Sequence, residues 1–113
     1  PVALIVPHAG YIYSGAIAAS AYSLLIPFKE QISRVILLGP SHRVPLVGIA
    51  TSSANAFQTP LGTIPLDKET ILQLNRLPFV QCNNEAHYYE HSLEVQLPFL
   101  QKILSSFSLV PLI

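Results

Sequence analysis

The sequence is poor in charged side chains and in cysteine, and it has no Met or Trp. Only 11% of its 113 residues are charged, and six Lys or Arg balance six Asp or Glu. Because the net charge is zero and the basic residues are scattered, we expect no nucleic-acid partner. A single cysteine, Cys82, excludes an internal disulfide and fits a cytoplasmic protein. We expect Cys82 to be a small buried apolar side chain.

Apolar side chains make up half of the chain, which is enough to build the core of one domain. The longest uncharged stretch, residues 1–28, is interrupted by proline, glycine and His8, so we expect no membrane span. No basic segment precedes a cleavage site of the signal-peptide type. The chain starts without Met and stops inside an apolar run. We therefore expect one domain over residues 1–113 that is part of a longer protein, with some of its sheet and its site outside this sequence.

Strand-like and helix-like segments alternate along the chain. We expect strands at residues 2–6, 34–38, 47–51 and 79–82, and helices at residues 15–25, 68–77 and 92–104. Ser14 and Asp67 are the expected N-caps, and Pro98 predicts a kink in the last helix. Pro60-Leu-Gly62 is expected to turn. This alternation predicts an α/β fold, a sandwich with a mostly parallel or mixed central sheet covered by helices.

Two histidines follow two of the expected strands. His8 comes after an apolar run that ends at Pro7, and His42 comes after residues 34–38 and Gly39-Pro-Ser41. Ligands in open α/β sheets gather beyond the carboxyl ends of the strands, so the two imidazoles are expected to converge there. Imidazole is a common metal ligand and a proton shuttle near neutral pH. His8 and His42 are therefore candidate metal ligands. Ser41 lacks the G-x-S-x-G elbow of a serine hydrolase.

A third cluster surrounds Glu90 and His91. We expect both side chains at the entrance of the last helix, where His91 can act as an acid or base and Glu90 can orient an imidazole, or both can simply cap the helix. The spacing His87-x-x-Glu90-His91 also fits the H-x-x-E-H pattern of zinc peptidases. That alternative requires one helix to cover residues 86–91.

Four motifs resemble those of a known family. They are Pro7-His-Ala-Gly-Tyr-Ile-Tyr-Ser-Gly15, Leu38-Gly-Pro-Ser-His42, Phe57-Gln-Thr-Pro-Leu-Gly62 and Glu90-His-Ser-Leu-Glu-Val-Gln-Leu-Pro-Phe99. Together they resemble the Memo family, whose prokaryotic members are often called AmmeMemoRadiSam system protein B. The resemblance implies a fold like that of the class III extradiol dioxygenases. It also implies a functional link to a radical-SAM protein.

In this resemblance His8 and His42 match two pocket histidines reported as metal ligands, and Glu90 and His91 match a Glu-His-Ser motif. Further family ligands, an Asp, a His and a Cys, have no match here, and Cys82 does not correspond to that cysteine. The resemblance implies a non-haem iron or copper pocket with redox or dioxygenase-like chemistry on an unknown substrate. The alternative is a binding or adaptor module that uses the same pocket for a peptide or a small anionic ligand.

Overall fold

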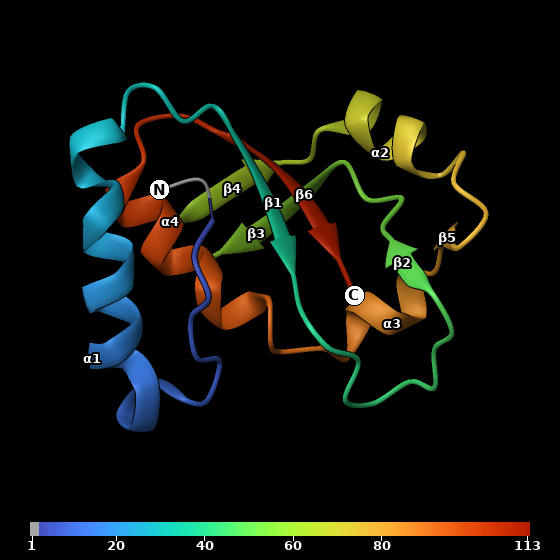
Figure 1. Cartoon of the computed structure of the whole chain (residues 1–113), viewed down its shortest axis with the longest axis horizontal. Coiled ribbons are helices and arrows are strands. Elements are labelled where there is room, and N and C mark those ends of the chain that lie inside the picture. Colours follow the sequence, from blue (N-terminus) through green and yellow to red (C-terminus); the bar gives the residue numbers. More distant parts are fainter. Residues whose placement is uncertain (1–2) are drawn as a thin grey trace.

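The computed structural model describes residues 3–113, and Figure 1 shows their arrangement. The elements follow one another in this order: α1 (Tyr11–Tyr22), a 3₁₀ helix η1 (Ser23–Phe28), β1 (Arg34–Leu38), β2 (Ile49–Thr51), β3 (Ala56–Thr59), β4 (Gly62–Pro65), α2 (Lys68–Leu74), β5 (Val80–Cys82), α3 (Asn84–Tyr88), η2 (Glu94–Gln96), α4 (Leu97–Ile103) and β6 (Ser108–Leu112). Helices alternate with small sheets, in which the strands pair either in parallel or antiparallel. The expected α/β class is confirmed.

Strand β6 lies at the centre of the fold. It pairs in parallel with β1, Val35 opposite Leu109, and on its other side Leu66 forms a parallel bridge to Leu109. Just past its end, Ile113 exchanges two backbone hydrogen bonds with Ala50 of β2, at 2.8 and 3.1 Å. These neighbours leave β6 buried from Leu109 onward. The strand reads as a continuous apolar run because both of its faces are covered.

The other two pairs of strands are smaller. β2 pairs in parallel with β5, and β3 forms an antiparallel hairpin with β4. The hairpin turns at Pro60 and Leu61, as the Pro-Leu-Gly sequence predicts. Its Ile64 and the following Leu66 enter the cluster that holds Leu109 and Val110. The hairpin therefore packs onto the central strand through side chains.

Helix α1 packs against α4 through a second cluster. Ala18, Tyr22 and Leu25 lie buried there with Leu100 and Leu104. Tyr22 also stacks on Phe99, with ring centroids 5.1 Å apart. Tyr11–Phe28, taken as one helical segment, is long and apolar enough to cross a membrane by length and composition, a test that core helices also pass.

The N-terminal part of the chain differs from the expectation. The strand predicted at residues 2–6 is absent from residues 3–6, and residue 2 lies outside the described residues. Leu4 and Val6 still pack against the cluster of α1 and α4. The helix that follows begins at Tyr11 with Gly10 as its N-cap, so Ser14 is not the cap. Ser14 lies inside α1 and donates a hydrogen bond to the carbonyl oxygen of Ala9 at 3.0 Å.

Two later features agree with what the sequence predicts, and a third does not. β1 has the predicted bounds, and Asp67 caps α2 by accepting a hydrogen bond from the backbone of Thr70 at 3.0 Å. The predicted kink at Pro98 is wrong. A 3₁₀ turn comes first, and Pro98 occupies the first turn of α4, where a missing N–H costs no helical hydrogen bond.

Cys82 is another correction, because it is exposed instead of buried. It closes the three-residue strand β5, of which only Val80 is buried. β5 has β2 as its one ladder partner within residues 3–113. An apolar run at such an edge does not guarantee burial of each residue.

We predict that Gly48→Ala destabilises the protein by at least about 2 kcal/mol. Gly48 has a φ of 91°, and a Cβ there would lie 2.3 Å from the carbonyl oxygen of Phe79. That oxygen accepts the hydrogen bond from Ile49 that joins the start of β2 to the segment before β5. Equilibrium denaturant unfolding measures the change.

The matched control is Gly15→Ala inside α1. Its Cβ would meet Tyr11 at an ordinary 3.5 Å. Because alanine favours a helix over glycine, this variant should gain up to about 1 kcal/mol. Equal effects of the two substitutions would contradict the assigned backbone conformation of Gly48.

Candidate functional site

The structure brings His8 and His42 together. Their ring centroids are 5.2 Å apart, and the ring planes are inclined at 56°. His8 follows residues 3–7, which form neither helix nor strand, while His42 follows β1 through Gly39, Pro40 and Ser41. Both residues are exposed, so the pair is open to solvent. The structure thus brings the two imidazoles together, although only His42 follows a strand.

A buried carboxylate, that of Glu90, holds His42 in place. One carboxylate oxygen accepts a hydrogen bond from the backbone N–H of His42 at 2.6 Å. The other lies 2.8 Å from Nδ1 of the His42 ring and accepts the backbone N–H of Ser92 at 3.0 Å. Only 3% of the Glu90 side chain is exposed, against 51% for His42. The carboxylate therefore joins the loop after β1 to the loop before η2.

The Glu90 carboxyl is ionised at neutral pH. Burial by itself raises its pKa, but the hydrogen bonds from His42 and Ser92 outweigh burial and lower the pKa to about 2. A carboxylate only accepts hydrogen bonds, so Nδ1 of His42 carries the proton that faces Glu90. When the ring is neutral, Nε2 carries the lone pair. This is the state in which an imidazole binds a metal ion.

The separation of the His8 and His42 rings can be compared with that of two imidazoles bound to one ion. Two rings that bind an ion through nitrogens about 2.1 Å from it have centroids roughly 4.5 to 6.5 Å apart. The observed 5.2 Å lies within that range. Among residues 3–113 no three His, Cys, Asp or Glu side chains gather into a group that could hold a metal. His8 and His42 thus form a pair and not part of a larger cluster of this kind within residues 3–113.

His91 lies apart from this arrangement in its contacts. Its ring is exposed, and its Nδ1 lies 2.7 Å from a carboxylate oxygen of Glu94. The His91 ring is thus paired with the nearby Glu94, whereas the Glu90 carboxylate is paired with the ring of His42. The proposed acid or base role of His91 and the catalytic role of Glu90 stay predictions.

The zinc peptidase alternative requires a helix that the structure does not have. α3 covers Asn84–Tyr88 and ends before Glu90. His87 lies within it, half-buried, with Nε2 2.9 Å from the carbonyl oxygen of Ala50. Burial lowers the pKa of His87, which the hydrogen bond to Ala50 partly offsets. His87 and His91 therefore do not form the two-histidine face of an H-x-x-E-H helix.

Gln96 is a supporting residue that sequence reasoning missed. Its Nε2 donates a hydrogen bond to the carbonyl oxygen of Pro7 at 3.0 Å, directly before His8. Its Oε1 accepts the hydroxyl proton of Tyr22 at 2.8 Å, and burial raises the pKa of that tyrosine to about 12. Gln96 thus ties the His8 loop to α1. Nothing in the sequence marks this glutamine beyond its place within the Glu90–Phe99 motif, and its burial is visible only in the structure.

Gly39 is a second supporting residue. A Cβ at this position would lie 2.7 Å from Leu93 Cδ2 and 2.7 Å from Ser92 Oγ. The hydroxyl of Ser92 in turn donates to the carbonyl oxygen of Pro40 at 3.3 Å. The loop that carries His42 therefore approaches the Glu90–Ser92 segment closely, and only glycine leaves room for it.

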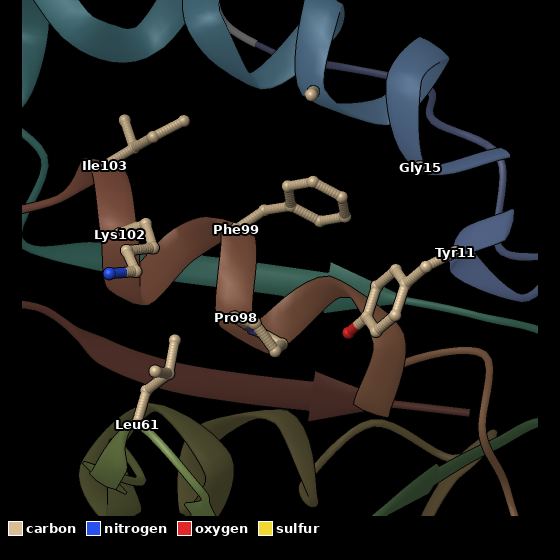
Figure 2. A pocket seen from close by; sticks show the side chains of 8 residues that line it. Tyr11, Gly15, Leu61, Pro98, Phe99, Lys102 and Ile103 are labelled. Carbon is tan, nitrogen blue, oxygen red and sulfur yellow. The ribbon is translucent and has the colours of Figure 1, made fainter.

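The described surface has two notable hollows. An apolar groove of about 420 Å³, shown in Figure 2, runs between α1, α4 and the hairpin turn and is lined by Tyr11, Gly15, Ala19, Leu61, Pro98, Phe99, Lys102 and Ile103. A second cavity of about 460 Å³ is lined by ten residues, among them Phe57, His87, Glu90 and Glu94. His8 and His42 line neither hollow. Of the four predicted site residues, Glu90 lines the second of these two hollows.

We predict that Glu90→Gln lowers the free energy of unfolding by about 2–3 kcal/mol at neutral pH, because it weakens three hydrogen bonds to a buried charge. The carboxyl has a depressed pKa in the folded state, so its contribution is fully present above its usual pKa of 4.5. It is lost as the pH falls toward about 2. Denaturant unfolding at a series of pH values should show the gap between wild type and variant closing over that window.

Glu69→Gln, which removes an exposed carboxyl from α2, is the control. It should change stability by no more than about 0.5 kcal/mol. A gap between wild type and Glu90→Gln that stays constant down to pH 2 would contradict the pKa given to Glu90.

The whole chain, residues 1–113, matches the family model described as Memo-like protein. It is 41% identical over 114 residues to a MEMO1 family protein of Aquifex aeolicus, covering 100% of this chain and 41% of that protein. A MEMO1 family protein of Saccharolobus islandicus is 40% identical over 96% of this chain and 39% of its own length. A MEMO1 family protein of Thermotoga neapolitana is 39% identical over 98% of this chain and 40% of its own length.

The chain therefore spans about two fifths of the length of these relatives. The matched region includes both histidines and the Glu90–His91 segment, since it extends over the complete sequence. On this match, the chain belongs to the Memo family of Memo-like proteins.

Proposed function

We propose that the chain carries part of a non-haem iron or copper site, with His8 and His42 as ligands. The observation that supports this most is the hydrogen bond between Nδ1 of His42 and the buried Glu90 carboxylate. Histidines that bind metals almost always donate their second ring N–H to a carboxylate, a carbonyl or water, which fixes the ring and its tautomer. Imidazole suits both iron and copper.

Each of the chain's own groups has a part in this proposal. Glu90 keeps the proton on Nδ1 of His42 and turns Nε2 away from the carboxylate. Gln96 holds the Pro7 carbonyl and so positions the loop of His8. The exposed rings leave the site open to a substrate. A bound iron or copper ion supplies one-electron and O₂ chemistry. In more detail, we propose a fold and a reaction that resemble those of the extradiol dioxygenases.

The experiment is a metal titration of the chain by calorimetry, with Fe²⁺ without oxygen and with Cu⁺ and Cu²⁺. The double variant His8→Ala/His42→Ala should bind more weakly by well over the roughly 10- to 100-fold that loss of an outer partner causes. The control His87→Gln removes an imidazole outside the pair and keeps a donor toward the Ala50 carbonyl. Its metal affinity should equal that of the wild type.

Unchanged affinity in the double variant would contradict the proposal. Binding of a peptide or a small anion that persists after complete removal of metal would favour the adaptor alternative instead. Both readouts concern binding, so neither depends on knowing the substrate.

A further prediction separates Glu90 from the ligands themselves. Glu90→Gln should lower metal affinity by about 10- to 100-fold, because His42 loses the partner that fixes its ring. Under conditions where the variant is fully folded, the electron paramagnetic resonance spectrum of bound Cu²⁺ should still show two nitrogen ligands. Loss of one nitrogen would instead make Glu90 essential for placing His42 at all. An unaltered affinity would exclude the positioning role.

A further inference from the structure

The two histidines of the pair are held in different ways. Glu90 bonds both the backbone N–H and the ring of His42 directly. Within residues 3–113 no backbone hydrogen bond involves His8. His8 also lies outside every helix and strand of this part of the chain, because α1 begins only at Tyr11. The position of His8 therefore depends on the residues before and after it.

The chain on either side of His8 is bonded to one place. The carbonyl oxygen of Pro7 accepts a hydrogen bond from Nε2 of Gln96 at 3.0 Å. The hydroxyl of Tyr11 donates to the carbonyl oxygen of Val95 at 3.0 Å, and Figure 2 shows the Tyr11 ring reaching from α1 toward α4. Because a short stretch of chain tied at both ends has few conformations, these two bonds restrict His8.

The amide of Gln96 can make its bond to Pro7 in one orientation only. Gln96 is 3% exposed, so water does not compete for its amide. The carbonyl of Pro7 can only accept, and the amide must therefore turn Nε2 toward it. Oε1 then faces the hydroxyl of Tyr22, which donates to it at 2.8 Å. Since a buried polar group without a partner costs free energy, the two bonds keep the Pro7 carbonyl in place.

The same short segment of the chain also holds His42. The Glu90 carboxylate bonds to His42, and the hydroxyl of Ser92 donates to the carbonyl oxygen of Pro40 at 3.3 Å. Both histidine loops are thus bonded to residues 90–96, one loop at the start of this segment and the other at its end. The segment can therefore set the separation of the two rings.

We propose that Gln96 and Tyr11 are positioning residues that hold His8 beside His42. They act on the backbone on either side of His8, whereas Glu90 acts on His42 itself. This role rests on the proposed function, because a fixed separation of two rings serves a pair of ligands, but the hydrogen bonds that carry it need no metal. Loss of these bonds should free His8 and leave His42 where it is.

The test starts from the chain without metal and uses two variants. Gln96→Leu has a side chain of similar size and removes the bonds to Pro7 and Tyr22, and Tyr11→Phe removes one hydroxyl only. Proton NMR measures the nuclear Overhauser effect between the two histidine rings, whose centroids lie 5.2 Å apart. Hydrogen exchange of the His42 amide reports in the same samples whether its bond to Glu90 persists.

The chain offers a matched control for each variant. Gln101→Leu also removes a glutamine that bonds a hydroxyl and a carbonyl, those of Thr59 and Gly62. Tyr13→Phe removes a hydroxyl from the same helix as Tyr11, at a side chain that is 84% exposed. Neither control touches the bonds on either side of His8.

We expect the cross peak between the rings to be lost in Gln96→Leu and weakened in Tyr11→Phe, with the His42 amide as protected as in the wild type. The controls should keep the cross peak at wild-type intensity. An unchanged cross peak in both variants, or an equal loss in Gln101→Leu, would overturn the proposal. If Gln96→Leu does not fold, Tyr11→Phe decides, because it removes a single oxygen from a half-exposed side chain.

Metal enters only in the second step. Calorimetry with Cu²⁺ should show an affinity of Gln96→Leu that is lower by about 10-fold or more, the effect expected of an outer partner, while Gln101→Leu equals the wild type. A wild-type chain that binds no Cu²⁺ would contradict the proposed function, and the cross peak would still decide whether Gln96 and Tyr11 position His8. Weak binding of Cu²⁺ to the variants with an intact cross peak would overturn the positioning role instead.

Discussion

The fold depends on the burial of β6 from Leu109 onward. An apolar strand with hydrogen-bonding groups on both edges can be buried only if each edge finds a partner. β1 pairs along one edge, and Leu66 forms a parallel bridge to Leu109 on the other. Just past the end of the strand, Ile113 forms backbone hydrogen bonds with Ala50. Segments that are far apart in the sequence are thereby drawn to one strand. The direction of β1 follows from this pairing, and with it the end at which His42 emerges.

The site depends on the buried Glu90 carboxylate in the same way. An ionised carboxylate costs much free energy to bury unless hydrogen bonds replace its water. Here the replacements are two backbone N–H groups and a ring nitrogen, from His42 and Ser92. Two loops 48 residues apart must therefore keep a fixed relation for the charge to remain satisfied. The position of His42 is a consequence of satisfying Glu90.

Local chemistry explains which parts of the fold were predictable. β1 was found at its true bounds because a run of aliphatic residues ends at Gly39-Pro40. Asp67 was found because an aspartate before a helical segment accepts a bond from that segment's own first turn. Residues 3–6 have the same apolar character as a strand. They form no ladder, and whether a partner strand exists is not a local property.

The candidate site shows the same division. His8 and His42 were expected to converge because each follows an apolar run, and ligands gather beyond the carboxyl ends of strands in α/β sheets. Their ring centroids lie 5.2 Å apart. The sequence placed Glu90 near them but left open which imidazole it touches. Gln96 was missed altogether, because a glutamine inside a helical motif carries no sign that it will bond to Pro7 and Tyr22. Such contacts span 74 to 89 residues and depend on how α1, α4 and the N-terminal loop pack.

The electrostatics of the site follow from its one buried charge. The chain as a whole is neutral, so it exerts no long-range attraction on a cation. A cation that reaches Nε2 of His42 nevertheless meets a ring polarised by the ionised Glu90 behind it. Because Glu90 is shielded from solvent while His42 is half exposed, the carboxylate is poorly screened by salt but cannot itself reach the ion. Its negative charge therefore acts through the imidazole, by holding the ring and its Nδ1 proton in place.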